Sequence, residues 1–466
     1  MNDRYRGSCV KLIQAVADIT LVFAGFIIAY LVSYQLSIPI AGTLISSNWL
    51  ILLSASSYFV FYLYDLYGDW QRKNIQHVVY SVVLSMVFFS IFISAISLLT
   101  PYLSFQQSFI FIAFLIQTIL LLAARASVWY LYKKFFGKRK VIIIGEDSNA
   151  GIHLADKIIN HHKGWFEISG FITAANMAII YENIKKCDLL LLSPNLSGED
   201  KEEILSLCMK HGKEAMVVPQ QFELSVIAAD IQQIDDMLVV SIKPPNISIS
   251  QRFLKRGFDV LISFLLLVIA SPLLLALFLF IPLTSKGPAL YKQERIGQKG
   301  NPYMIYKFRS MIQDAEERTG PVLATDRDPR ITAIGRFIRA VRLDELPQLL
   351  NVLKGDMSIV GPRPEREYFI NQFKQKLPEY HYRLTVKPGI TGLAQVLANY
   401  TTPVEDKLRF DLLYVHNYSF WLDVKILFQT IRVVLQPEQA QGLKEENNLP
   451  NQRLLKSLKK KKVMNH

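Results

Sequence analysis

The amino-acid sequence predicts a membrane protein in three parts. These are an N-terminal bundle of four transmembrane helices, a Rossmann-like α/β module, and a C-terminal α-rich monotopic domain with a re-entrant membrane helix. Four apolar runs, each close to the ~20 residues that cross a bilayer as a helix, fill the first third of the chain. Short apolar runs then alternate with helical stretches, as in a parallel sheet with crossover helices. A last apolar stretch has a proline near its middle.

The composition agrees with a membrane location. The chain has 466 residues, enough for two or three domains, and 51% of them are hydrophobic, with a mean hydropathy of +0.23. Its net charge of +13 suits an anionic partner. Because apolar runs are so abundant, we expect membrane lipid and phosphate rather than nucleic acid. Cys9, Cys187 and Cys208 have no metal-ligand spacing and are expected to be reduced thiols.

The predicted bundle occupies residues 1–135. Its four apolar runs span about 12–34, 48–67, 78–99 and 105–128. Lys and Arg occur before the first run, between the second and third, and after the fourth, whereas the loops after the first and third runs are uncharged. This distribution places both ends of the bundle in the cytoplasm. Asp18, Asp65 and Arg125 lie near helix ends, where we expect a pair between helices or snorkelling rather than a functional site.

Residues 138–243 form the predicted Rossmann-like module. Its strand-like runs are 141–145, 187–194 and 215–219. The turn after the first strand does not fit a dinucleotide site, because Asp147 and Ala150 stand where G-x-G-x-x-G requires glycine. Tyr181 and Lys185 match the Tyr-x-x-x-Lys pair of reductases and epimerases, a pattern of two letters only. We therefore expect a spacer, a dimer contact or a regulatory domain.

The apolar stretch at 250–284 has the length of a fifth transmembrane helix. Pro272 near its middle removes a backbone hydrogen bond, and Ser271 can satisfy a group that the proline frees. Lys255 and Lys286 put positive charge at both ends. These features favour a helix that breaks at Ser271-Pro272 and returns to the same membrane face, with a straight span as the alternative.

Two cationic regions follow this helix. Residues 285–311 mix Lys307, Arg309 and other basic residues with tyrosines, as expected for phosphate binding or for a basic belt on anionic lipid. Residues 328–365 hold arginines spaced by three, an adjacent acid pair and a Pro-Arg-Pro segment. The spaced arginines, Arg336, Arg339 and Arg342, are expected to share a helix face that holds a diphosphate.

The acid pair is Asp344 and Glu345. Pro347 is expected to open a new helix, which places both carboxylates in the turn before a helix N-terminus, where the helix dipole favours negative charge. Taken alone, an acid pair at this position is usually a solvated cap. The density of cations around two acids within an apolar frame favours a functional site.

The segment LDELPQLLNVLKGDMSIVGPRPE resembles the signature of the bacterial sugar transferases that act on polyprenyl phosphate, the monotopic phosphoglycosyl transferases. The resemblance continues through KRGFD, Ser271-Pro272, residues 285–311 and KPGITGLAQV, and covers roughly residues 250–436. The first half of the chain resembles the larger members of that family. The implied domains are a re-entrant helix at 250–284, a catalytic domain at 285–440 and a polybasic tail at 441–466.

The resemblance implies transfer of hexose-1-phosphate from a UDP-sugar to polyprenyl (undecaprenyl) phosphate, with release of UMP. This reaction starts the assembly of exopolysaccharide, capsule or O-antigen repeat units at the cytoplasmic face of the bacterial inner membrane. Asp344 is implied as the covalent nucleophile, with Glu345 beside it and Mg²⁺ on both carboxylates. Arg339 is expected to hold a substrate phosphate and Arg363 the nucleotide. Lys307 and Arg309, with Arg336 and Arg342, complete the predicted cationic wall.

Two other classes of function stay open on the sequence. A membrane-bound nucleotide-sugar epimerase or dehydratase would also join four spans to a Rossmann module, but it needs an intact glycine motif. A non-catalytic regulator of polysaccharide assembly would have no use for the acid pair. The sequence does not identify the sugar, although glucose and galactose are favoured for long family members, and it leaves a homodimer open.

Overall fold

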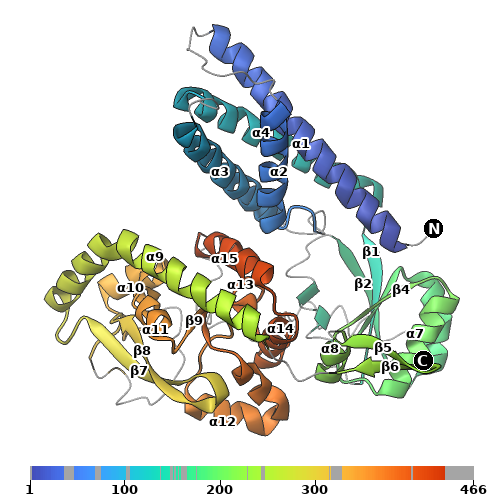
Figure 1. Ribbon diagram of the computed structural model, residues 1–466. Coiled ribbons are helices and arrows are strands. Elements are labelled where there is room, and N and C mark those ends of the chain that lie inside the picture. The colour runs from blue at the N-terminus through green and yellow to red at the C-terminus, as the bar shows by residue number, and fades with distance from the viewer. Residues whose placement is uncertain are drawn as a thin grey trace. The chain divides into compact units, whose positions relative to one another are not determined.

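The computed structural model describes residues 3–35, 47–68, 75–100, 105–136, 138–146, 151, 154–155, 157–158, 165–174, 176–227, 229–242, 247–313, 315, 328–399 and 402–435. These residues form two compact units, which meet in the chain between Val218 and Pro219. Asp147, Ala150 and the polybasic tail lie outside the described residues. Figure 1 shows a helix bundle and a small sheet in the first unit, and a mixed, helix-rich second unit.

The N-terminal unit begins with an apolar helix bundle. Its helices are α1 (Asp3–Gln35), α2 (Ser47–Leu63), α3 (Ile75–Leu99) and α4 (Gln107–Phe136). Among the described residues, α1, α3 and α4 are apolar and long enough to cross a membrane, while α2 has 17 residues and is shorter. The prediction of four spans is therefore confirmed for three of the four runs in this region.

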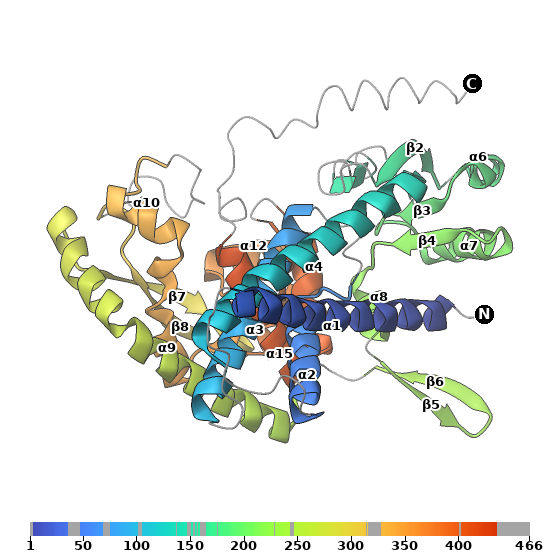
Figure 2. The same ribbon diagram turned by 90° about the horizontal axis from the view of Figure 1, so that it is seen from above.

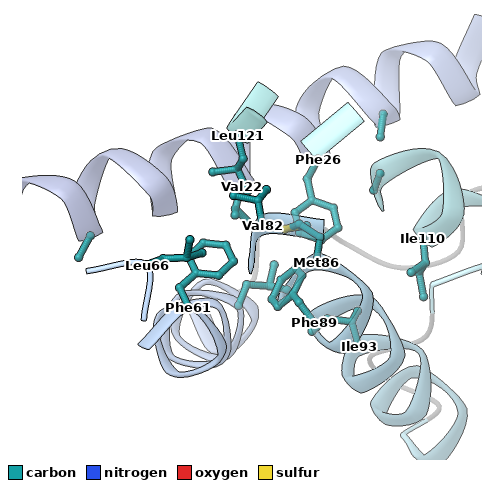
Figure 3. Packing of buried hydrophobic residues seen from close by; sticks show 14 of the residues in the cluster. Val22, Phe26, Phe61, Leu66, Val82, Met86, Phe89, Ile93, Ile110 and Leu121 are labelled. Carbon is teal, nitrogen blue, oxygen red and sulfur yellow. The ribbon is translucent and has the colours of Figure 1, made fainter. Parts of the chain in front are cut away.

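Aromatic and aliphatic side chains fill the centre of the bundle. Val22 and Phe26 of α1 meet Met86 and Phe89 of α3, and Leu121 of α4 joins the same cluster (Figure 3). All five side chains are almost completely buried. The mutual exclusion of these apolar surfaces from solvent and lipid, with close packing, accounts for the arrangement of the helices.

The bundle also buries one pair of opposite charges. Arg125 of α4 donates a hydrogen bond to Asp18 of α1, and both side chains are buried. This contact is the helix–helix pair that the sequence favoured for these positions. It links the first and last helices of the bundle.

A four-stranded parallel sheet follows the bundle, as predicted. Its strands are β1 (Arg139–Gly145), β2 (Phe166–Thr173), β3 (Leu189–Leu192) and β4 (Glu214–Val217), in the order β2-β1-β3-β4. Neighbouring helices include α6 (Met177–Asn183), η3 (Ile184–Lys186) and α7 (Gly198–Lys210). Alternate residues of β1 enter two apolar clusters, Ile142 and Ile144 in one and Val141 and Ile143 in the other. Both faces of the strand are thus covered, as parallel sheets require.

The second unit is described from α8 to α15. Its N-terminal elements are α8 (Gln221–Ile227), β5 (Asp230–Ile234), β6 (Met237–Ser241), α9 (Ile249–Thr284), β7 (Leu290–Ile296), η4 (Gln298–Gly300) and β8 (Pro302–Phe308). The C-terminal elements are α10 (Ala333–Ala340), η5 (Leu343–Glu345), α11 (Gln348–Lys354), β9 (Ser358–Val360), α12 (Glu367–Lys376), η6 (Pro378–Thr385), β10 (Gly389–Thr391), α13 (Leu393–Leu397), α14 (Val404–His416) and α15 (Phe420–Val434). Strands β7 and β8 form an antiparallel hairpin, and β9 pairs with β10 in parallel.

Helix α9 corrects the expectation of a break at Ser271-Pro272. It is helical from Ile249 to Thr284, 36 residues, with Pro272 and Pro282 inside, and Figures 1 and 2 show a curved ribbon without interruption. A proline leaves the carbonyl four residues earlier without its N–H donor. Here the Ser271 hydroxyl donates to the Val268 carbonyl at 2.7 Å. The serine therefore replaces the hydrogen bond that Pro272 removes, and the helix continues.

Both ends of α9 are fastened to the same unit. Near its start, buried Lys255 donates to Asp423 of α15 at 2.6 Å and to the Val360 carbonyl at 3.0 Å. Near its end, Ile281 is fully buried in a cluster with Phe308. Large apolar side chains between these ends, such as Phe264, Ile269 and Phe278, are exposed. The middle of α9 therefore presents an apolar surface suited to lipid.

Candidate active site

The two predicted acids lie in a short connection between helices. Thr332 caps α10, accepting a hydrogen bond from the Gly335 N–H at 3.0 Å. Gly335 allows α10 to approach the strand region closely, because a Cβ there would lie 1.9 Å from the Ser310 carbonyl oxygen. After α10 the chain turns through η5, which contains Asp344 and Glu345. Pro347 then precedes α11, which confirms the predicted new helix.

Arg342 is not on the helix face predicted for it. Helix α10 ends at Ala340, so it carries Arg336 and Arg339 but not Arg342. Arg342 has left-handed backbone angles, φ 56° and ψ 23°, which an arginine rarely adopts. The strained residue reverses the chain between α10 and the acids, and such strain is characteristic of functional connections.

Glu345 is the centre of a buried cluster of charges. Its Oε1 atom accepts from the Lys307 ammonium at 3.1 Å and from the Arg363 guanidinium at 2.7 Å. Only 9% of Glu345 is exposed. Burial alone would raise its pKa, but Arg363 and Lys307 hold the pKa of Glu345 well below its usual range. Three predicted site residues, Lys307, Glu345 and Arg363, are thus brought together here.

Asp344 has a different environment although it is the next residue. It is half-buried, and the described residues supply it with no hydrogen bond or ion pair. Burial and the negative charge of Glu345 raise the pKa of Asp344 to about 6. Because Glu345 takes the direct contacts of the nearby cations, Asp344 is left available to react with a substrate.

The arginines of α10 contribute unequally. The positive charge of Arg339, which is half-buried, acts to lower the pKa of Asp344, so this guanidinium lies close enough to influence the carboxylate. Arg336 is exposed, and no hydrogen bond or ion pair joins its side chain to another described residue. The site therefore includes Arg339 more directly than Arg336.

Arg309 lies elsewhere. Its guanidinium donates to the Lys286 carbonyl at 2.6 Å and to the Ser285 carbonyl and hydroxyl at 2.7 and 2.9 Å. These acceptors are at the C-terminal end of α9, where carbonyl groups lack helical partners. Arg309 therefore caps the membrane helix, and its donors do not face Glu345 as the predicted cationic wall required.

Asn351 and Arg256 are important residues that the sequence interpretation did not identify. Asn351 is fully buried on α11; its Oδ1 accepts from the Tyr306 N–H at 3.0 Å, and its Nδ2 donates to the Met304 carbonyl at 2.7 Å. Arg256 of α9 donates to the Val352 and Leu353 carbonyls at 2.6 and 2.7 Å. A polar residue on the apolar face of PQLLNVLK is the signal that could have identified Asn351.

The acid pair is compatible with Mg²⁺. Both oxygens of Asp344 and the Oε2 atom of Glu345 accept no hydrogen bond from the described residues. No group of three or more His, Cys, Asp or Glu side chains suited to a metal occurs in the described part of the chain. Mg²⁺ typically uses one or two carboxylates together with substrate phosphates and waters, so two carboxylates suffice.

Comparison with known proteins identifies the family of this chain. The bacterial sugar transferase family matches residues 250–437. The undecaprenyl-phosphate galactose phosphotransferase of Salmonella typhimurium is 33% identical over 401 residues, which cover 79% of this chain and 83% of that relative. A galactosyl transferase of Streptococcus agalactiae is 30% identical over 84% of this chain and 95% of its own length.

A third relative has a higher sequence identity over a shorter region. The UDP-N-acetylgalactosamine-undecaprenyl-phosphate N-acetylgalactosaminephosphotransferase of Aeromonas hydrophila is 47% identical over 186 residues, 39% of this chain. The alignment spans 44% of that relative. Because the alignments to the Salmonella and Streptococcus proteins extend over most of both partners, this chain belongs to the bacterial sugar transferase family and is a phosphoglycosyl transferase.

Proposed function

We propose that this enzyme transfers hexose-1-phosphate from a UDP-sugar to undecaprenyl phosphate at the cytoplasmic face of the bacterial inner membrane, releasing UMP. The product starts the assembly of a polysaccharide such as a capsule. The observation that carries the mechanism is the contrast between the two acids: Glu345 is neutralised by Lys307 and Arg363, while Asp344 has no partner among the described residues. Relatives named for transfer to undecaprenyl phosphate support the substrate classes.

In the first step, an Asp344 oxygen attacks the phosphorus that bears the sugar. A bond from the carboxylate oxygen to phosphorus forms, the bond from phosphorus to the bridging oxygen breaks, and UMP leaves with that electron pair. In the second step, a phosphate oxygen of undecaprenyl phosphate attacks the same phosphorus. The bond to Asp344 breaks, the carboxylate is restored, and the lipid diphosphate sugar is released.

The neighbouring residues bind and orient the anionic groups. In this proposal Arg339 holds a donor phosphate near Asp344, and Arg363 binds the nucleotide while it keeps Glu345 ionised; the influence of Arg339 on the Asp344 carboxylate and the Arg363–Glu345 hydrogen bond support these roles. Lys307 holds the other side of Glu345. When bound, Mg²⁺ on Asp344 and Glu345 supplies a Lewis acid for the diphosphate oxygens. We expect EDTA to stop turnover and added Mg²⁺ to restore it.

We also propose that α9 enters and leaves the membrane on one side. Support comes from its two ends, since Lys255 and Ile281 are both buried against the same unit. A straight crossing of the ~30 Å hydrocarbon core would separate these ends on opposite sides. In this arrangement the curve of α9, seen in Figures 1 and 2, keeps the active site on the same side as the cytoplasmic UDP-sugar.

Cysteine labelling tests this topology. Lys299→Cys, at an exposed position after α9, should be shielded from an impermeant thiol reagent added to intact cells. Gln106→Cys, in the region predicted to face outward, is the matched positive control. A Ser271→Ala, Pro272→Leu variant removes the bend and should label at residue 299 with a fall in activity. Labelling of residue 299 in the parent from outside would disprove the one-sided arrangement.

Transfer assays test the reaction itself. Purified enzyme, Mg²⁺, undecaprenyl phosphate and radiolabelled UDP-hexose should give a lipid-linked sugar together with UMP. Mass spectrometry of enzyme treated with donor alone should find hexose phosphate on the peptide that contains Asp344. Release of UDP instead of UMP would contradict the proposed bond cleavage.

The sugar requires a panel of donors. Relatives are named for galactose, glucose and N-acetylgalactosamine. We favour UDP-glucose and UDP-galactose, with UDP-N-acetylgalactosamine as the third donor to compare. The donor with the highest kcat/KM identifies the substrate.

A further inference from the structure

The Pro-Arg-Pro segment that carries Arg363 is held by its carbonyl groups. Four successive carbonyls, from residues 362 to 365, each accept a hydrogen bond from outside the segment. The donors are Gly389 N at 2.9 Å to Pro362, Arg383 Nη2 at 2.8 Å to Arg363, Arg295 Nη1 at 3.1 Å to Pro364, and Ile296 N at 3.1 Å to Glu365. Two of these four donors are guanidinium groups, although both acceptors are neutral.

This arrangement follows from the residues of the segment. Pro362 and Pro364 have no N–H group, so neither residue can donate to a neighbouring strand or loop. Proline fixes φ, but it does not fix where the peptide plane of Arg363 lies relative to the acids. With two of the segment's donors missing, the four hydrogen bonds to its carbonyls hold the segment in place.

Arg383, which donates to the Arg363 carbonyl, is a buried residue with a balanced charge. Its side chain is 5% exposed and pairs with Asp411 of α14 at 2.8 Å, which is also 5% exposed. A further donor of Arg383 binds the Tyr380 hydroxyl at 2.7 Å. Because its charge is balanced by Asp411, the guanidinium can direct its remaining donor to the Arg363 carbonyl.

Arg295 donates to the next carbonyl, that of Pro364. Arg295 precedes the segment in the sequence, whereas Arg383 follows it. Arg295 lies on β7, donates to the Gln293 side chain at 2.7 Å and approaches the Glu365 carboxylate at 3.5 Å. The same strand supplies the Ile296 N–H to the Glu365 carbonyl. The segment is therefore hydrogen-bonded to two separate elements, the β7–β8 hairpin and η6.

We propose that Arg383 and Arg295 are positioning residues that aim the Arg363 guanidinium at Glu345 and at the donor nucleotide. The proposal rests on the proposed role of Arg363 in nucleotide binding. A tilt of the Arg363 peptide plane moves a side chain whose Nη2 atom lies 2.7 Å from Glu345. Misplacement of a substrate-binding group by about 1 Å can lower the rate ~100-fold.

A double-mutant cycle tests the proposal in the full-length enzyme. Arg383→Met is combined with Asp411→Leu so that no unpaired charge remains buried. This variant should fold as the parent does, lower kcat/KM by roughly 10- to 100-fold, and raise the KM for the UDP-sugar while leaving the KM for undecaprenyl phosphate unchanged. Arg383→Lys, which keeps a donor, should recover part of the loss.

The cycle is completed in an Arg363→Ala background. There the Arg383→Met, Asp411→Leu change should have almost no further effect on kcat/KM, because the group being positioned is gone. Arg409→Met is the control, since Arg409 also donates to a backbone carbonyl, that of Pro219, but does not contact the segment. It should leave kcat/KM unchanged in both backgrounds.

The outcomes separate this proposal from the function on which it rests. Full additivity of the Arg383 and Arg363 variants, or equal increases in both KM values, would overturn the positioning role alone. An Arg363→Ala enzyme as active as the parent would overturn the nucleotide-binding role of Arg363 and the positioning role together. The Asp344 mechanism would still be tested separately, by mass spectrometry of the hexose phosphate attached to Asp344.

Discussion

The two units of this enzyme use buried charge in different ways. The described part of the N-terminal unit buries the ion pair Asp18–Arg125 within a largely apolar bundle. The second unit buries Lys255–Asp423, Arg383–Asp411 and the Glu345 cluster. Apolar packing is sufficient to assemble helices, whereas handling a diphosphate requires charges at fixed positions. The difference indicates that the second unit carries the chemistry, and each prediction below tests that division.

The largest effect is expected at Asp344, the acid whose carboxylate has no partner among the described residues. Asp344→Asn removes the proposed nucleophile and should lower kcat by at least ~1,000-fold, as expected when a covalent step is lost. The fold should be unaffected, since the described residues make no hydrogen bond to this carboxylate. Asp356→Asn, the same change beyond the other end of α11, is the control and should remain active. A steady-state UMP assay measures both variants, and an active Asp344→Asn enzyme would refute the mechanism.

A large loss of stability is expected where α9 is fastened. Lys255→Met leaves Asp423 buried without its cation and should destabilise the second unit by about 3–5 kcal/mol. Adding Asp423→Leu should restore much of this stability, because neither charge then remains. Thermal unfolding in detergent measures both variants. If Lys255→Met unfolds at the temperature of the parent, the buried pair does not hold α9.

A smaller effect is expected from the charge pair of the bundle. Asp18→Asn combined with Arg125→Gln leaves no buried charge unpaired and keeps a polar pair between the helices, so it should cost about 1 kcal/mol, the range of hydrogen bonds between membrane helices. The kcat/KM of the folded enzyme should not change. Comparing thermal unfolding with transfer activity separates these two quantities. A large fall in kcat/KM with normal folding would show that the bundle takes part in the chemistry.

The smallest effect on the chemical step is expected from removing the first unit. A chain that begins at Pro219 retains the whole second unit and should still transfer hexose-1-phosphate to undecaprenyl phosphate. An UMP-release assay in detergent or nanodiscs measures this activity. The matched Asp344→Asn variant of the shortened chain gives the background. Complete inactivity of a folded shortened enzyme would show that the division between the units is wrong.

Local patterns in the sequence predicted the elements more reliably than the contacts. Apolar length correctly indicated three of the four N-terminal spans, and strand–helix alternation indicated the parallel sheet but not its strand β2, because these signals depend on nearby residues. The three-residue spacing of Arg336, Arg339 and Arg342 suggested that they share one helix face. Helix α10 ends before Arg342, which has left-handed backbone angles. Pro272 suggested a break, but the neighbouring serine compensates for the lost hydrogen bond.

The supporting residues of the site depend on distant partners. The Lys255 and Asp423 contact joins positions 168 residues apart, and Arg383 reaches Asp411 across 28. Arg309 illustrates the same difficulty, since its place in a basic segment suggested substrate binding, while the fold gives it the end of α9. Which of several cations meets an acid is decided by tertiary packing, which a local motif does not contain.

Helix α11 couples the membrane anchor to the reacting group. Arg256 of α9 donates to the carbonyls at its C-terminal end, and the two acids of the proposed site precede its N-terminal end. Its seven residues form a stiff rod about 10 Å long. On the proposed mechanism, a change in the depth or tilt of α9 would be transmitted through α11 to Asp344, and the hydrocarbon thickness of the bilayer should then alter the rate of transfer.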